Sequence, residues 1–166
     1  GAYASGGIRP ISRTLHNDLL YALNAGGSGN IAGFHIEGFG RLRPLSDATR
    51  PLSNGGSGAT VGPAEIAFSP DGNLLAVTEK NTQLIDTYVV KRNGRARGPL
   101  TQPSSGPTPF GFSFGKDDAL IVSEAFGGAA NASAVSSYTA ANSGKLSVVR
   151  GSAATGKTAA SGIEGS

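Results

Sequence analysis

The sequence predicts an all-β chain made of repeated four-stranded antiparallel sheets, and three observations support this fold class. The 166 residues include 26 Gly and 9 Pro, which together are about twice their ordinary usage and indicate many turns. Four short elements recur in the same order three times, at a spacing of about 45 to 55 residues. No stretch shows an apolar period of 3.6 residues flanked by helix caps, so we expect few helices.

The first recurring element is a strand that leads into a turn. It covers residues 63–69 in the middle copy and residues 109–115 in the third, whereas the first copy, at residues 9–12, is degraded. In the middle copy Pro70-Asp71-Gly72 follows the strand directly. Pro, Asp and Gly each favour tight turn geometry, so this segment is predicted to reverse the chain into a second strand.

The other three elements complete a four-stranded unit. The second is a short apolar run closed by a polar residue, the third has an aliphatic residue three positions before an aromatic one, and the fourth is a glycine turn. Asn93-Gly94 is a typical hairpin turn and is predicted to connect the third and fourth strands of the middle copy. The second element covers residues 19–24, 74–79 and 119–124; the third covers 31–34, 85–88 and 135–138; the fourth covers 40–42, 94–96 and 144–146.

A four-stranded meander repeated at this period is the shape of a β-propeller blade. Residues three apart on a strand point to opposite faces, so the third element needs cover on both sides, as in stacked blades. A β-sandwich or β-solenoid is the alternative, because the many small residues suit it too. We predict about three blades of a larger, seven-bladed ring, near residues 8–50, 62–102 and 107–150, with residues 151–166 forming the start of a next blade or a tail.

Residues 68–79, together with 108–112 and 134–138, resemble the lactonase family of seven-bladed β-propellers, which includes 6-phosphogluconolactonases and carboxymuconate cyclases. The resemblance covers roughly residues 8–160, and its more specific part is the repeat of 77–79 in 122–124. It implies a hydrolase or cyclase that acts on a lactone or a related organic acid, without a metal or another cofactor. The alternative is a non-catalytic binding or scaffold module, since propellers carry many unrelated functions.

The candidate site residues are those that occupy the same position in different copies. Asn24, Glu79 and Glu124 each end a second strand, and Lys80 follows Glu79. In a propeller these strand ends lie on one face, around the channel mouth. Glu79 and Glu124 are candidate catalytic residues, which could direct water at a lactone carbonyl, and Asn24 and Lys80 are candidate substrate-binding residues. The alternative is that a repeated polar residue ends an apolar strand and satisfies backbone amides.

The composition and the charge pattern indicate which other kinds of partner are not expected. The chain has no Cys, and its two histidines, His16 and His35, have no neighbouring carboxylate cluster, so no metal site is predicted. The net charge of +3 is spread along the chain, and the densest basic patch, residues 91–97, is interpreted as a solvated hairpin tip. No apolar run is long enough to span a membrane. We therefore expect a small-molecule substrate and neither a nucleic-acid nor a membrane partner.

Three blades cannot close a ring, because propellers usually have four to eight. An isolated wedge would expose two apolar sheet faces. We therefore expect residues 1–166 to belong to a larger propeller, or copies to associate, for instance two wedges that give six blades. The sequence does not begin with Met, so the chain is expected to start after processing or to be an incomplete translation product. A secreted or periplasmic location is favoured over a cytoplasmic one.

Overall fold

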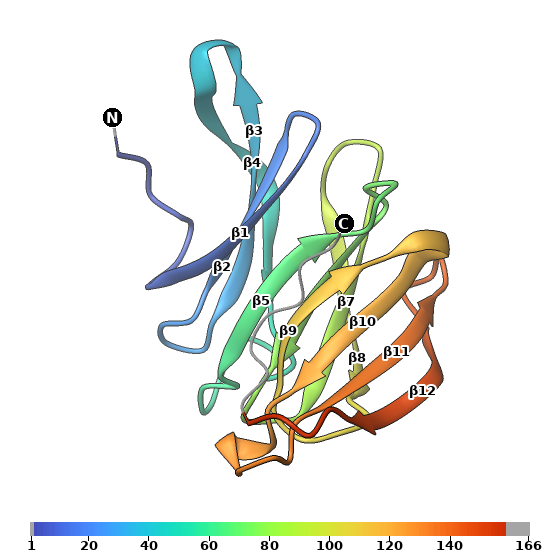
Figure 1. Cartoon of the computed structure of the whole chain (residues 1–166). Helices are drawn as coiled ribbons and strands as arrows, with labels where there is room; N and C mark the ends of the chain where they lie inside the picture. Colours follow the sequence, from blue (N-terminus) through green and yellow to red (C-terminus); the bar gives the residue numbers. More distant parts are fainter. Residues whose placement is uncertain (1, 159–166) are drawn as a thin grey trace.

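The computed structural model describes residues 2–158 and contains three four-stranded antiparallel sheets (Figure 1). The first sheet consists of β1 (Pro10–His16), β2 (Leu19–Asn24), β3 (Asn30–Glu37) and β4 (Arg41–Pro51). The second consists of β5 (Pro63–Phe68), β6 (Leu74–Glu79), β7 (Leu84–Val90) and β8 (Ala96–Pro103). The third consists of β9 (Pro109–Phe114), β10 (Ala119–Glu124), β11 (Ala134–Ala140) and β12 (Leu146–Ala154). Each sheet is a meander in chain order, so the predicted all-β blade architecture is confirmed.

Helices are confined to short turns in the part of the chain that the structure describes. These are three 3₁₀ segments: η1 (Gly38–Gly40), η2 (Lys116–Asp118) and η3 (Phe126–Gly128). None of them is long or apolar enough to cross a lipid bilayer. Strand β12 extends to Ala154, so the first residues of the segment 151–166 lie in the last strand of the third sheet. The end of that segment, from residue 159, lies outside the described residues.

The turn between β5 and β6 has the geometry expected from its sequence. The Asp71 carboxylate accepts hydrogen bonds from the Ser69 hydroxyl at 2.6 Å and from the Asn73 amide at 3.0 Å. The Ser69 bond, helped by that of Asn73, lowers the pKa of Asp71. Gly72 has a φ of +74°, which residues with a Cβ rarely adopt. The turn thus delivers the chain into β6, whose six residues are all buried.

The sheets stack through their faces, and their first strands β1, β5 and β9 lie side by side (Figure 1). One core fills the space between the first and second sheets, and another fills the space between the second and third. The first includes Tyr21, Leu23, Ile31, Ile66, Leu75, Val77 and Tyr88. The second includes Ala76, Ile85, Phe112, Leu120, Val122 and Tyr138. The middle sheet is therefore covered on both faces, as stacked blades require.

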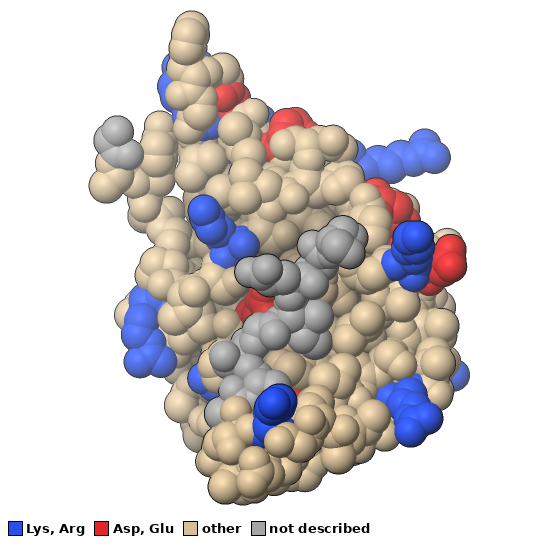
Figure 2. All heavy atoms as spheres, in the orientation of Figure 1, with Lys and Arg blue, Asp and Glu red and all other residues tan. Residues whose placement is uncertain are grey.

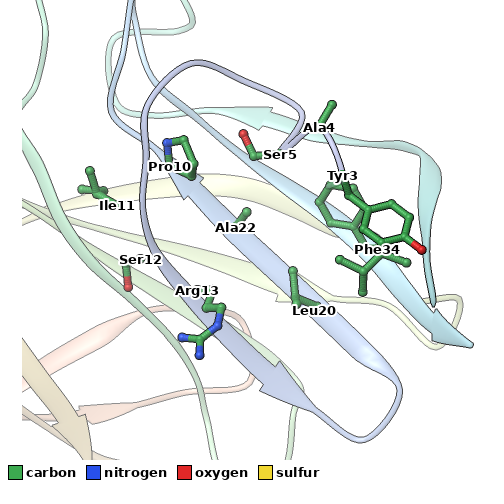
Figure 3. Close-up of a pocket in the computed structure, with 11 residues that line it drawn as sticks. Tyr3, Ala4, Ser5, Pro10, Ile11, Ser12, Arg13, Leu20, Ala22 and Phe34 are labelled. Carbon is green, nitrogen blue, oxygen red and sulfur yellow. The ribbon is translucent and has the colours of Figure 1, made fainter. Parts of the chain in front are cut away.

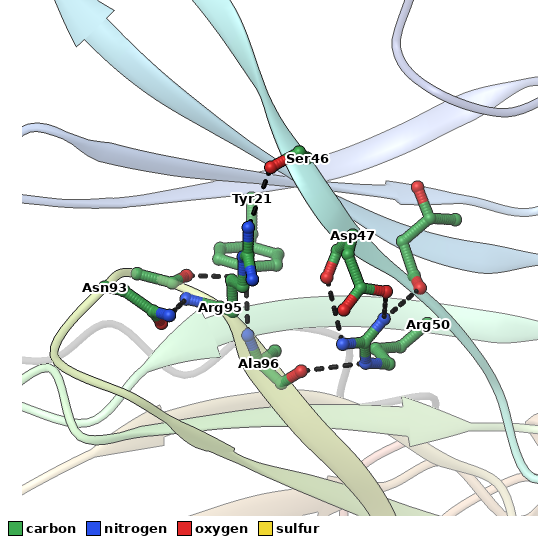
Figure 4. A network of polar contacts seen from close by, with 9 residues as sticks. Tyr21, Ser46, Asp47, Arg50, Asn93, Arg95 and Ala96 are labelled. Carbon is green, nitrogen blue, oxygen red and sulfur yellow. Dashed lines mark hydrogen bonds and ion pairs between the residues drawn. The ribbon is translucent and has the colours of Figure 1, made fainter.

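Polar contacts join β2 and β4 of the first sheet to β8 of the second sheet and the turn that precedes it (Figure 4). The buried Tyr21 hydroxyl accepts a hydrogen bond from the Ala96 amide at 2.8 Å and donates one to the Gly94 carbonyl at 2.8 Å. Burial raises the pKa of Tyr21. The Arg50 guanidinium donates to the Ala96 carbonyl at 2.8 Å, and Arg95 donates to the Ser46 hydroxyl at 2.8 Å. Part of the basic hairpin tip at residues 91–97 is thus attached to the neighbouring sheet.

The other face of the first sheet is only partly covered. It carries a small apolar cluster formed by Ala22, Ala32 and Phe34. A cavity of about 320 Å³ opens on this cluster, between the sheet and the N-terminal segment that contains Tyr3 (Figure 3). At the opposite end of the molecule, Val148 and Val149 of β12 are 58% and 65% exposed. Both outer sheets therefore leave apolar surface without a neighbouring sheet.

Candidate functional site

The predicted site residues occupy equivalent places in three separate sheets. Asn24, Glu79 and Glu124 are the last residues of β2, β6 and β10, and all three are fully buried. Each lies against the segment of chain that enters its own sheet. Within the part of the chain that the structure describes, no hydrogen bond joins any two of them.

Both oxygens of Glu79 are engaged by hydrogen-bond donors. Oε1 accepts a hydrogen bond from the Ser53 amide at 3.0 Å. Oε2 accepts hydrogen bonds from the Ser53 hydroxyl and the Thr82 hydroxyl, each at 2.5 Å. Ser53 lies in the connector between β4 and β5, and Thr82 lies in the loop between β6 and β7. Glu79 therefore ties the incoming chain to the loop at the end of its own strand.

A second acid lies beside Glu79 on the neighbouring strand β7. Asp86 is fully buried and accepts a hydrogen bond from the Thr101 hydroxyl at 2.6 Å. Burial raises the pKa of Asp86 to about 7, and the nearby charge of Glu79 acts in the same direction. A carboxyl group with this pKa is protonated below about pH 7, and Oδ2 of Asp86 is buried without a hydrogen-bond partner among the described residues. Burial also raises the pKa of Tyr88, whose hydroxyl donates to the Pro51 carbonyl at 2.9 Å.

Glu124 has fewer partners than Glu79. The Ser136 hydroxyl donates a short hydrogen bond to its Oε1. Its Oε2 is buried and has no hydrogen-bond partner among the described residues. Gly106, in the connector between β8 and β9, lies so close that a Cβ there would be 2.2 Å from Oε2. The connector thus supplies no hydroxyl group to this acid, unlike the connector at Glu79.

Asn24 contacts the segment that precedes the first sheet. Its side-chain amide donates to the Ser5 carbonyl at 3.1 Å and to Asn30 Oδ1 at 2.8 Å, and its own Oδ1 accepts from the Ser5 hydroxyl at 2.6 Å. Like Glu79, it binds the incoming chain. These contacts match the alternative interpretation of the repeated polar position, in which it satisfies backbone groups. The catalytic role of Glu79 and Glu124 and the binding role of Asn24 stay predictions.

Lys80 differs from its neighbour Glu79 because it is only half-buried. Its backbone amide donates to the Gly62 carbonyl at 2.9 Å, which fixes the start of the loop after β6. Its Nζ lies 4.9 Å from the centroid of the Phe110 ring. A cation over an aromatic face is attracted by the quadrupole of the ring. Lys80 therefore reaches from the second sheet to the first strand of the third.

Sequence analysis did not single out two acids. Glu65, on β5, is half-buried, and its Oε2 accepts a hydrogen bond from the Phe112 amide at 2.8 Å. Burial raises the pKa of Glu65, and the Phe112 bond opposes the shift. Asp86 is the second such acid. Each is an acidic residue inside an apolar strand, which is the signal that would have found them.

The described residues, 2–158, contain no group of three or more His, Cys, Asp and Glu side chains that could hold a metal ion. His35 lies 3.0 Å from Asp18, but no third such side chain within residues 2–158 joins this pair. On the face that Figure 2 shows, Lys and Arg side chains are dispersed among acidic and neutral residues.

Comparison with known proteins identifies the family. The family described as "Lactonase, 7-bladed beta-propeller" matches residues 28–160. The chain belongs to the seven-bladed β-propeller lactonase family. Its three sheets are therefore three blades of a larger propeller. No similar sequence was found among curated proteins.

Solved structures of lactonases have the same fold. A periplasmic gluconolactonase from Pseudomonas aeruginosa is 22% identical, with a TM-score of 0.68, and the match covers 85% of this chain and 38% of that one. A Bacteroides uniformis protein assigned as a 6-phosphogluconolactonase is 12% identical, with a TM-score of 0.70 and coverage of 92% and 46%. A similarly assigned protein from Bacteroides fragilis is 18% identical, with a TM-score of 0.67 and coverage of 84% and 37%. The chain thus spans less than half the length of these structures.

Proposed function

We propose that the complete protein acts on a lactone or on a related organic acid, by hydrolysis of the ring ester or by the reverse cyclisation. The observation that carries this proposal is the family match over residues 28–160. The names of two structural neighbours, a gluconolactonase and a 6-phosphogluconolactonase, favour a sugar-acid lactone as the substrate. The periplasmic source of the gluconolactonase supports a periplasmic or secreted location.

The test is turnover by the complete protein of 6-phosphogluconolactone and of simple γ- and δ-lactones, measured above the spontaneous rate of hydrolysis. Turnover of any of these that depends on enzyme concentration supports the proposal. Absence of turnover with all of them rejects it. We expect no loss of activity in the presence of a chelator, because the proposal assigns no step to a metal.

The predicted roles of the strand-end residues are part of this proposal. Glu79 and Glu124 are proposed as catalytic residues, and Asn24 and Lys80 as substrate-binding residues. Lys80 has the most accessible functional group of the four, because the other three side chains are fully buried. Loss of turnover in Glu79→Gln, with folding retained, would support the catalytic assignment. Unchanged turnover would remove it.

A non-catalytic binding or scaffold function is the second candidate. It is favoured by the hydrogen bonds that engage Asn24 and Glu79, which already satisfy the connectors between blades. On this hypothesis the complete protein would turn over no lactone. Glu79→Gln would then change stability alone.

Ring closure is also a proposal. The apolar cluster and cavity on the first sheet need a neighbouring sheet, which either the remaining blades or a second copy would provide. Light scattering on the 166-residue chain alone tests this requirement. We expect association or aggregation, and a stable, monodisperse monomer of 16.6 kDa would contradict it.

A further inference from the structure

The residue before the first strand has the same backbone conformation in all three blades. Arg9, Gly62 and Thr108 each precede the proline that begins β1, β5 or β9, and their φ angles are +56°, +63° and +58°. The carbonyl of each accepts a hydrogen bond of 2.9 to 3.0 Å from the backbone amide of the residue after the strand-end position, namely Ala25, Lys80 and Ala125. The blade geometry therefore calls for a left-handed conformation at this position.

Only blade 2 has the residue that this conformation favours. Gly62 adopts it freely, whereas a residue with a Cβ is strained there. Thr108 uses its side chain locally, because its Oγ1 accepts a hydrogen bond from the Gly127 amide at 3.0 Å. The Arg9 side chain is exposed and makes no hydrogen bond or ion pair with any residue in 2–158. The fold thus gives no reason for an arginine at a strained position, and such a position points to a function.

Arg9 lines a cavity that lies between the first two blades. The cavity has a volume of about 400 Å³ and opens between the start of β1, the loop from β2 to β3 and the connector from β4 to β5. Its walls include Ile8 and the backbone of Gly26, and a Cβ on Gly26 would lie 2.5 Å from the Ile8 side chain. Arg9 is the one charged residue among the described residues that line it. Its positive charge in this cavity is therefore not neutralised.

Thr60 adds a hydroxyl group to the same cavity. Its Oγ1 accepts a hydrogen bond from the Gly62 amide at 3.3 Å, and its own hydrogen is free to donate. Arg9 contributes a planar guanidinium, which carries only donors and binds carboxylate or phosphate groups through paired N–H bonds. A cation and a hydroxyl donor without an acid beside them fit an oxyanion.

The cavity lies at the end of the blades that carries the strand-end residues. Pro10, which follows Arg9, pairs with Asn24 in the ladder of β1 and β2. Pro63 pairs with Glu79 in the same way in blade 2. An anion bound at Arg9 would therefore lie on the face where the candidate site residues lie.

We propose that the cavity at Arg9 binds the carboxylate or phosphate group of a small ligand, with Arg9 as the residue that selects for the negative charge. If that ligand is the lactone, the group is a charged substituent of the substrate, and this part of the inference rests on the proposed function. Arg9 is a binding residue here, and no bond is made or broken at it.

The test is isothermal titration calorimetry of the complete protein with 6-phosphogluconate, glucose 6-phosphate, gluconate and glucose. We expect 6-phosphogluconate to bind and uncharged glucose not to bind. Binding of glucose 6-phosphate assigns the cavity to a phosphate group, and binding of gluconate assigns it to a carboxylate group. Failure of all three anionic probes to bind, or equal affinity for glucose, would overturn the inference.

Arg9→Gly is the decisive variant, because it copies Gly62 of blade 2. It should fold, with a urea midpoint equal to or above that of the wild type, since the strained residue is replaced by one that favours this conformation. We expect its affinity for 6-phosphogluconate to fall about 10-fold or more. Arg9→Lys keeps the charge but not the planar fork, so its affinity should lie between those of the wild type and Arg9→Gly.

Arg92→Gln is the matched control. It also removes an exposed and unpaired arginine, from the turn between β7 and β8 at the opposite end of blade 2. Its affinity should equal that of the wild type. Wild-type affinity in Arg9→Gly, or an equal loss in Arg92→Gln, would overturn the site.

The binding test and the turnover test separate the two proposals. A protein that binds the anionic probes through Arg9 but hydrolyses no lactone would reject the proposed function and keep the anion site. A protein that hydrolyses lactones but binds none of the anionic probes would keep the proposed function and reject the site.

Discussion

Glu79 and Glu124 occupy the same position in neighbouring blades, yet their surroundings differ. Around Glu79, Ser53 and Thr82 provide three hydrogen-bond donors. Around Glu124, Ser136 provides one donor, and the connector has a glycine where it approaches the carboxylate. The repeat therefore preserves the position of the acid but not its partners.

The comparison shows which interactions the blade geometry requires. In both blades the acid lies against the incoming connector, and a tyrosine on the third strand binds either that connector or the last strand residue before it. Tyr88 donates to the Pro51 carbonyl at 2.9 Å, and the Tyr138 hydroxyl accepts from the Ser105 amide at 2.8 Å. The side chains that neutralise or solvate the acid are free to differ. Blade 2 alone adds a second acid, Asp86, so the two blades should respond differently to mutation and pH.

The largest effect is expected when Glu79 is removed. Glu79→Ala leaves the Ser53 amide and two hydroxyl groups without their acceptor, and a part-buried donor left unpaired costs about 1 to 3 kcal/mol. We expect the free energy of unfolding of the complete protein to fall by about 3 kcal/mol, as measured by urea denaturation. Glu79→Gln, which keeps one acceptor oxygen, should lose less than half as much. A loss below about 1 kcal/mol for Glu79→Ala would show that water replaces these contacts.

The next effect is a pH dependence specific to blade 2. The folded protein binds the Asp86 proton more tightly than the unfolded chain, because burial raises the pKa of Asp86 from 3.8 to about 7. This contribution to stability is complete at pH values below the unfolded pKa and is lost as the pH rises through the folded pKa. We expect the unfolding free energy to fall by about 2 kcal/mol between pH 5 and pH 8.

Asp86→Asn should abolish most of this pH dependence, because the amide has no proton to lose in this range. The measurement is denaturant unfolding of both proteins at each pH, and Asp71→Asn provides a control acid on the surface of the same blade. Equal slopes for wild type and Asp86→Asn would contradict the raised pKa of Asp86.

A smaller effect is expected when blade 2 is made to resemble blade 3. Ser53→Gly removes the hydroxyl that donates to Glu79 Oε2 at 2.5 Å but keeps the amide that donates to Oε1. A hydrogen bond to a charged group contributes about 1.5 to 3 kcal/mol, and we expect a loss near the lower value. Thermal unfolding provides the measurement. An unchanged midpoint would mean that Thr82 alone satisfies Oε2.

The smallest effect is expected at Glu124. In Glu124→Gln one oxygen can still accept from Ser136, and the group that replaces Oε2 stays without a partner, as Oε2 is now. The gain from removing a buried charge exceeds the cost of burying the new amide group only slightly. Stability should therefore rise by less than about 1 kcal/mol. Calorimetry of Glu124→Gln beside Glu79→Gln tests the contrast. A loss as large as that of Glu79→Gln would show that Oε2 of Glu124 has a partner in the complete ring.

The sequence predicted the blades because turn residues and apolar runs are local signals. Pro70-Asp71-Gly72 and the run of β6 indicate one hairpin without any knowledge of the rest of the fold. The repeat also located the strand-end residues, and Lys80 beside them. It could not show that Ser53 meets Glu79, because this contact joins residues far apart in the chain. Glu65 escaped notice for the same reason, since its partner Phe112 lies in another blade.

The hydrogen bonds between Glu79 and Ser53 have a consequence for how the protein unfolds. The amide of Ser53 lies in a connector rather than in a sheet, yet it is bound to the last residue of a strand in the following blade. Its exchange with deuterium should therefore follow the opening of blade 2, although the connector is continuous with β4 of blade 1. Asn24 binds the carbonyl and the hydroxyl of Ser5, so the segment before β1 should likewise open together with blade 1. The units of cooperative opening are thus shifted along the chain, so that each one begins in the connector before its own first strand.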